Sequence, residues 1–203
     1  MTPLTITAQV KGPLVTGGGY MTFDALLAAA IYARTQDIER AHEHLPLART
    51  GRMYHASAAV TEPISVGRKA IVQGMRPDLD LLPWLKKNSA GNVHRAFSSM
   101  PDNILNSYRS LDVDTVTWYC EGDPDRIRPL LDALPMIGKK RSTEVMHWGI
   151  EHGELDGVTG YADEPLRPVP VWLWKGERTH VIADVNWRPA YWDPRQKAPC
   201  YVA

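Results

Sequence analysis

The sequence predicts an α+β fold whose strands and helices follow the order β-α-β-(β)-β-α-β, the order of a ferredoxin-like sheet with both helices on one face. Three observations predict this class. Residues 4–10 alternate apolar and polar side chains, residues 113–120 are rich in Val, Thr, Trp and Tyr, and a helical pattern follows each segment. At 203 residues the chain can bury a substantial core, so we expect a single domain spanning residues 1–203.

The first strand and the first helix are predicted from their apolar spacing. Thr22 is placed to cap the helix, and Asp24 in its first turn suits the helix dipole. The helical pattern ends near residues 34–37. The residues expected to face the core are Leu4, Ile6, Ala8 and Val10 in the strand, and Phe23, Leu26, Leu27, Ala30 and Ile31 in the helix.

The middle of the chain is predicted to hold two short strand segments and an insertion. Residues 53–73 favour extended structure, with interruptions at Pro63 and Gly67. Residues 74–110 are polar and rich in turn-forming residues, so we expect an irregular insertion there rather than part of the sheet.

The second half of the chain repeats the strand–helix–strand pattern. Asp123 and Pro124 are typical of the N-cap and the first residue of a helix. Pro129 removes a backbone donor inside this helix, which predicts a kink or a split there. In the strand that follows, the alternating apolar residues are Met146, Trp148 and Ile150.

Residues 155–203 are expected to form a β-rich C-terminal extension. Residues 171–174 and 179–185 predict a hairpin around Lys175-Gly176-Glu177. Four of the seven tryptophans fall between Trp172 and Trp192. Such a cluster can stack on nucleic-acid bases, but we favour a core and a contact surface for other subunits.

Composition narrows the classes of function. Lys and Arg number 23 and Asp and Glu also number 23, so any grip on nucleic acid must come from local clusters of cations. Two cysteines without CxxC spacing, no secretory segment and no apolar run of about 20 residues predict a soluble cytoplasmic protein without membrane contact. No cofactor or metal is predicted, and Gly17-Gly18-Gly19 lacks the Lys-Ser/Thr of a nucleotide-binding loop.

The strongest local cluster of cations is Gly138-Lys139-Lys140-Arg141, between the second helix and the last strand. Gly138 would let the main chain approach a phosphate, successive N–H groups could form an anion-binding concavity, and the three cations would supply charge. The alternative is a solvated turn whose cations merely suit the C-terminus of a helix.

Further candidate RNA-binding residues lie in three other stretches. The insertion could clamp single-stranded RNA, with Trp84 or Phe97 as a stacking face, or it could be a surface excursion whose apolar residues pack on the body. The candidates are Arg68 and Lys69 in the extended region, Lys86, Lys87, His94 and Arg95 in the insertion, and Arg49 and Arg52 beside a predicted strand.

The chain resembles the RAMP superfamily of CRISPR-associated RNA-binding proteins, which have a ferredoxin-like (RRM-like) fold. Within it the chain looks like the fifth Cas family, the subunit that caps the crRNA 5′ handle in type IV effector complexes. The stretches that carry the resemblance span nearly the whole chain. They are Gly12-Pro13-Leu14-Val15-Thr16-Gly17-Gly18-Gly19-Tyr20, Phe23-Asp24-Ala25-Leu26-Leu27-Ala28-Ala29-Ala30, Tyr54-His55-Ala56-Ser57-Ala58, Ile137-Gly138-Lys139-Lys140-Arg141-Ser142 and Pro189-Ala190-Tyr191-Trp192.

This resemblance implies a non-catalytic subunit of a ribonucleoprotein that serves antiviral or anti-plasmid defence. Its implied partners are the crRNA 5′ handle and the backbone and large subunits of the effector complex, with target DNA as a further candidate. Base pairing by the guide would supply target specificity, so the protein need read only backbone and shape.

Two other functions stay open. A metal-independent endonuclease of the same superfamily could cleave repeat RNA with His147 as acid or base, assisted by Tyr54 or Lys140. The remaining histidines show no metal-binding spacing. The second alternative is a protein–protein scaffold that does not contact RNA.

Overall fold

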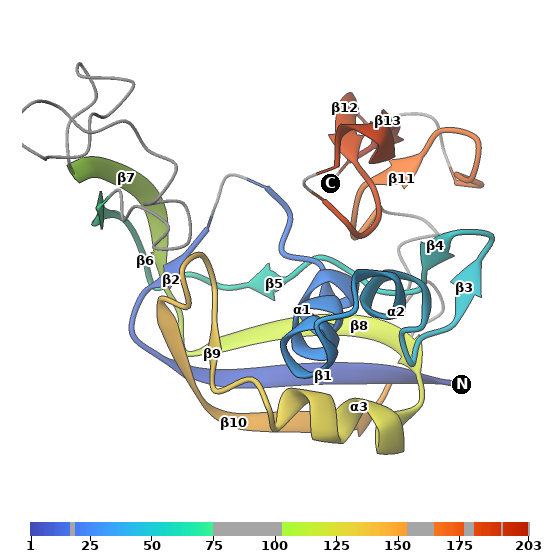
Figure 1. The fold of residues 1–203 in the computed structure, drawn as a ribbon, viewed down its shortest axis with the longest axis horizontal. Helices are drawn as coiled ribbons and strands as arrows, with labels where there is room; N and C mark the ends of the chain where they lie inside the picture. Colours follow the sequence, from blue (N-terminus) through green and yellow to red (C-terminus); the bar gives the residue numbers. More distant parts are fainter. Residues whose placement is uncertain (17–18, 75–102, 154–164, 177–180, 192, 203) are drawn as a thin grey trace, which may run out of the picture. The chain divides into compact units, whose positions relative to one another are not determined.

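The computed structural model describes residues 1–16, 19–74, 103–153, 165–176, 181–191 and 193–202. The fold of these residues is α+β, as the sequence predicts. The chain divides into two units, one formed by residues 1–67 and 109–203 and the other by residues 68–108. The elements are β1 Thr2–Lys11, β2 Leu14–Val15, α1 Phe23–Thr35, α2 Ile38–Glu43, β3 Arg49–Thr50, β4 Met53–Tyr54, β5 Val60–Thr61, β6 Ser65–Gly74, β7 Asn103–Asp112, β8 Thr115–Gly122, α3 Pro124–Leu131, β9 Met136–Ile137, β10 Thr143–His152, β11 Val169–Pro170, β12 Ile182–Asn186, a 3₁₀ turn Pro194–Gln196 and β13 Lys197–Tyr201 (Figure 1).

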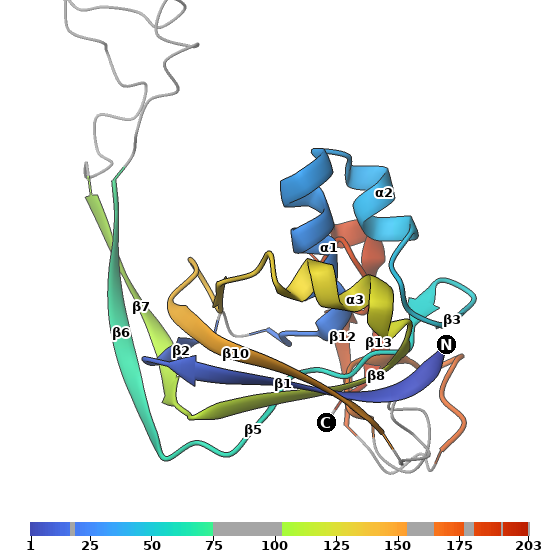
Figure 2. The same cartoon turned by 90° about the horizontal axis from the view of Figure 1, so that it is seen from below.

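The first unit is built on a five-stranded antiparallel sheet with the strand order β5-β8-β1-β10-β9. The helices α1, α2 and α3 lie on one face of this sheet (Figure 2). Its centre is the fully buried Trp118, whose ring lies 6.1 Å from that of Phe23 and 5.9 Å from that of Trp148. The core therefore joins the central strands to the first helix, as the alternation in residues 4–10 predicts.

The two main helices begin where the sequence places them. Thr22 is the N-cap of α1, although its side chain makes no capping hydrogen bond. Asp123 caps α3 and accepts hydrogen bonds from the backbone N–H groups of Asp125 and Arg126 at 3.1 and 3.3 Å. Helix α3 continues through Pro129 to Leu131, so it is not split there.

A β-bulge changes which residues of β10 face the core. Gln9 pairs with His147 whereas Val10 pairs with Val145, so Met146 is the extra residue of the bulge. Trp148 stays buried, but Met146 is 60% exposed. The predicted alternation of Met146 with Trp148 and Ile150 is therefore interrupted, because the inserted residue shifts the register before Trp148.

The segment predicted to be irregular, residues 74–110, includes most of a regular strand at its C-terminal end. Strand β7 already begins at Asn103, and within the first unit its last residues Ser110 and Leu111 pair with Val15 and Leu14 of β2. In the second unit β6 lies beside β7. Residues 75–102 of the predicted insertion lie outside the described residues.

The C-terminal extension forms a separate antiparallel sheet in the order β11-β13-β12. The predicted hairpin between residues 171–174 and 179–185 is wrong, because β11 and β12 both pair with β13. The backbone N–H groups of Leu173 and Trp174 both donate to the carbonyl of Pro170, so the chain turns where a strand was expected. Of the tryptophans there, Trp174 is buried and Trp172 is 62% exposed.

None of the helices in the described residues is long and apolar enough to cross a membrane. Cys120 and Cys200 are both buried and free. Burial raises the pKa of each thiol to about 12, so both stay protonated at neutral pH.

Candidate nucleic-acid interface

The cationic loop Gly138–Arg141 connects β9 to β10 and is fixed against the β2 segment. The backbone N–H of Lys139 donates to the carbonyl of Val15 at 2.8 Å, and the N–H of Val15 donates to Oγ of Ser142 at 3.2 Å. Thr143 Oγ1 donates to the carbonyl of Pro13 at 2.8 Å. Residues 13–15 and 137–142, from two of the stretches that carry the family resemblance, therefore lie side by side.

Gly138 is required at the start of this loop. Its φ is +79°, a conformation that residues with a side chain rarely adopt. A Cβ at this position would lie 2.8 Å from Oγ of Ser142 and 3.2 Å from the carbonyl oxygen of Val15. Any other residue would push the loop away from its anchor.

Lys140 and Arg141 also have left-handed backbone conformations, with φ of 59° and 52°. Such conformations cost about 1–2 kcal/mol for each residue that carries a Cβ. Both side chains are exposed, whereas Lys139 is half-buried. Glycine would satisfy this backbone at lower cost, and strain of this kind concentrates at functional sites, so the two cations point to a role for their charge.

The predicted cradle of main-chain amides is only partly available. The N–H of Lys139 is occupied by Val15, and the N–H of Arg141 donates to the carbonyl of Gly138 at 3.1 Å. The loop therefore offers mainly side-chain charge to an anion.

A second group of cations surrounds Glu43 at the end of α2. Arg49, Arg52 and Arg188 place a guanidinium nitrogen 3.9, 3.5 and 3.1 Å from its carboxylate. We call these three residues and Glu43 the Glu43 cluster. Because three cations face one carboxylate, the cluster carries excess positive charge, and Arg49 and Arg52 are largely exposed. Arg188 was not predicted from the sequence, because no pattern in the neighbouring residues indicates that this arginine is buried, at 4% exposure.

The Glu43 cluster makes the stability of the fold depend on pH. Burial raises the pKa of Glu43, but the charges and hydrogen bonds of Arg188 and Arg52 outweigh burial, so its pKa lies below the ordinary value of 4.5. A carboxylate with a lowered pKa stabilises the fold above its unfolded pKa and loses this contribution as the pH falls through the folded pKa. We expect Glu43→Gln to be less stable than wild type at pH 7, and the difference to shrink below pH 4.5.

Urea unfolding of both proteins across this pH range measures the effect. Glu39→Gln, on the same helix, is the matched control because Glu39 makes no ion pair with the described residues. A difference for Glu43→Gln that stays constant with pH would contradict a charge-based role.

The two cationic groups lie at opposite ends of the sheet. Leu47, just before β3, bridges to Gly122, which pairs with Thr2 at the start of β1. The loop lies at the other end, where Lys11 pairs with Glu144. A ten-residue strand spans about 30 Å, so the residues predicted as one RNA track form two separate places in the first unit.

The remaining predicted residues lie in the second unit or outside the described residues. Arg68 and Lys69 belong to the second unit, where Nε of Arg68 donates to Oγ of Ser107 at 3.0 Å. Lys86, Lys87, His94 and Arg95, together with Trp84 and Phe97, lie outside the described residues.

The predicted catalytic pairing of His147 with Tyr54 is wrong. Tyr54 is 3% exposed, and its hydroxyl donates to the carbonyl of His42 at 3.1 Å, whereas His147 is exposed on β10 opposite Gln9. Another histidine is better positioned: the ring nitrogens of His55 lie 2.8 Å from Glu121 Oε2 and 2.8 Å from Thr50 Oγ1. Within the described residues no group of three or more His, Cys, Asp or Glu side chains could hold a metal ion.

A buried arginine that sequence reasoning missed joins the C-terminal extension to the first helix. Arg167 and Asp24 are both 0% exposed and lie 3.0 Å apart. Arg167 also donates to the carbonyls of Tyr54, Ala56 and Trp187 and to the hydroxyl of Tyr191. Burial raises the pKa of Tyr191 well above its usual value, so its hydroxyl keeps its proton. These contacts give Asp24, Tyr54, Ala56 and Tyr191, from three stretches of the family resemblance, a role in stabilising the fold.

No model of a known protein family matches the sequence, and no curated protein matches it. Among solved structures, a chain of "Cryo-EM structure of the Type III-B Cmr-beta bound to cognate target RNA" is similar over 74% of this chain, with 11% identity and a TM-score of 0.37. This chain spans 61% of the length of that chain. At this score the likeness assigns neither a fold family nor a function.

Proposed function

We propose that this chain is a non-catalytic RNA-binding subunit of a type IV CRISPR ribonucleoprotein, and that its cationic loop holds the 5′ handle of the crRNA. The observation that carries this proposal is the loop itself. It presents exposed Lys140 and Arg141 on a left-handed backbone, and Gly138 and Val15 fix its position. Sugar–phosphate chains are bound chiefly through cations of this kind.

The strand order supports the ferredoxin-like, RAMP-type part of the proposal. Taking β1, β5, β8 and β10 as the four strands of a split βαβ repeat, the first strand lies between the third and the fourth, and the second lies at an edge. The loop then follows the second helix of the repeat, as the family resemblance implies.

In this role the chain would work in the cytoplasm, in antiviral or anti-plasmid defence. It would contact the backbone and large subunits of the effector complex, with target DNA as a further candidate partner. Charge on the loop would fix the handle, while the guide would supply sequence recognition by base pairing.

The salt dependence of RNA binding tests this function. The guide RNA isolated from the co-expressed complex is labelled and rebound to the purified chain at increasing salt concentration. Each phosphate neutralised on a single strand contributes a slope of about −0.7 in log K against log salt, so three loop cations predict about −2. A complex without RNA, or binding that does not change with salt, would favour the scaffold function instead.

The endonuclease remains a second candidate because of one observation, the contact of His55 with Glu121. A carboxylate on one ring nitrogen orients an imidazole for proton transfer at the other, which in His55 contacts Thr50 Oγ1. Cleavage of repeat RNA by the wild type that is lost in His55→Gln would support it, and loss in His147→Ala would instead support the site predicted from the sequence.

A further inference from the structure

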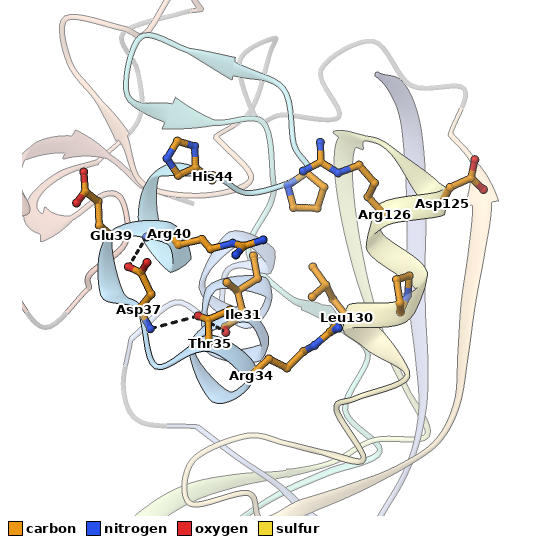
Figure 3. Close-up of a pocket in the computed structure, with 12 residues that line it drawn as sticks. Ile31, Arg34, Thr35, Asp37, Glu39, Arg40, His44, Asp125, Arg126 and Leu130 are labelled. Carbon is orange, nitrogen blue, oxygen red and sulfur yellow. Dashed lines mark hydrogen bonds between the residues drawn. The ribbon is translucent and has the colours of Figure 1, made fainter.

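A cleft on the helical face of the first unit has the chemistry of a protein-binding site. It has a volume of about 970 Å³ and lies between α1 and α2 on one side and α3 on the other (Figure 3). No predicted RNA-binding residue in the described part of the chain lines it. The cleft is therefore a surface that the proposed function does not use.

Three arginines from three helices line this cleft. In Figure 3 the side chains of Arg34 and Arg40 extend toward α3, and Arg126 extends from α3 back toward them. All three are exposed, and none forms an ion pair with a carboxylate of the described chain. Guanidinium groups without a carboxylate partner are well suited to bind an anionic ligand bidentately.

The acidic residues nearby do not neutralise the inside of the cleft. Asp37 caps α2 by accepting a hydrogen bond from the backbone N–H of Arg40 at 2.9 Å. The carboxylates of Glu39 and Asp125 point away from the cleft (Figure 3). The cations thus face inward and two of the three acids face outward.

The base of the cleft is apolar. Ile31 and Leu130 line the cleft and are each 8% exposed. Pro46 and Pro129 also line it. Pro129 has no N–H, so the carbonyl of Asp125 in the cleft wall lacks its α-helical donor. The cleft therefore combines an apolar base with an arginine rim.

We propose that this cleft binds an acidic segment of a partner protein, with an apolar side chain on the base and carboxylates on Arg34, Arg40 and Arg126. Protein interfaces have this anatomy of apolar anchors ringed by arginine. Single-stranded nucleic acid is the less suitable occupant, because no Trp, Tyr or Phe lines the cleft for base stacking. The proposal goes beyond the proposed function and does not depend on the cationic loop.

Four probes test the proposal against the full chain by fluorescence anisotropy. The first is a ten-residue peptide with two leucines flanked by four glutamates. The second replaces the leucines with serine, the third replaces the glutamates with glutamine, and the fourth is a ten-nucleotide oligothymidine. We expect the first peptide to bind most tightly of the three peptides, and substitutions in the cleft to leave binding of the oligonucleotide unchanged.

Matched variants locate the binding. Arg34→Gln/Arg126→Gln should weaken the first peptide about tenfold or more, whereas Lys175→Gln/Lys197→Gln, which removes the same charge from exposed residues elsewhere, should not. Arg126→Glu is the second variant, since an acid in the first turn of α3 suits the helix dipole and keeps the fold intact. Oligonucleotide binding that the cleft variants weaken, equal binding of the first peptide by the cleft variants, or no binding of the first peptide would overturn the proposal.

Discussion

Arg167→Met is expected to destabilise the first unit by about 3–5 kcal/mol, the largest stability effect of any substitution considered for this chain. The change keeps most of the side-chain volume but leaves Asp24 as an unpaired charge with 0% exposure. It also removes one hydrogen bond from each of the carbonyls of Tyr54, Ala56 and Trp187. Equilibrium unfolding in urea measures the loss.

Two further variants separate charge from packing. Arg167→Met/Asp24→Leu removes the buried charge as well, so we expect it to be more stable than the single variant. Arg195→Met breaks the ion pair with Asp193 at a side chain that is 84% exposed, and we expect a much smaller loss than for Arg167→Met. Additive losses in the double variant would show that the buried pair is not coupled.

Lys140→Gly/Arg141→Gly is expected to weaken binding of the guide RNA about 100-fold while leaving the fold at least as stable as wild type. The loss follows from two charge-assisted phosphate contacts at about 1.5 kcal/mol each. The stability follows from the left-handed backbone at both positions, which glycine adopts without the penalty that a Cβ imposes. Anisotropy with labelled RNA and urea unfolding give the two readouts.

Weaker RNA binding in a variant that is at least as stable as wild type would exclude unfolding as the cause of the weaker binding. Lys175→Gly/Lys197→Gly carries the same change in charge at exposed residues outside the loop, and we expect it to leave RNA affinity near that of wild type. The slope of log K against log salt should also decrease in magnitude by about 0.7 for each lost contact. Unchanged affinity in the loop variant would remove the loop from the proposed RNA site.

The sequence correctly predicted those strands and helices that are signalled by the spacing of neighbouring residues. The alternation in residues 4–10 corresponds to β1, with Leu4, Ile6 and Ala8 buried, and Asp123 with Pro124 marks the start of α3. Each signal depends on the spacing of neighbouring residues, which one sequence displays directly.

Features that depend on distant partners were missed or wrong. Strand β13 was not predicted. It contains Pro199, a residue that is rare in a strand between two others, yet β11 and β12 pair on either side of it. The bulge at Met146 depends on the register with β1, and no local pattern indicates it.

In the candidate site too, local features were predicted and contacts between distant residues were not. The loop was predicted as a cluster of cations, and its glycine has the positive φ that such a turn requires. Its anchoring by Val15 and Ser142 joins segments 127 residues apart, so spacing could not reveal it. The same holds for Arg188, which meets Glu43 from a distant part of the chain.

The bond between Arg167 and Asp24 also sets an order of events during synthesis. The two residues are 143 positions apart, so at about 5–20 residues per second the ribosome adds Arg167 on the order of 10 s after Asp24. Until then the Asp24 carboxylate of helix α1 lacks the Arg167 guanidinium with which it forms a buried ion pair. The first helix therefore reaches its final environment only after most of the polypeptide has been made, and the nascent N-terminal half stays open to chaperones during that interval.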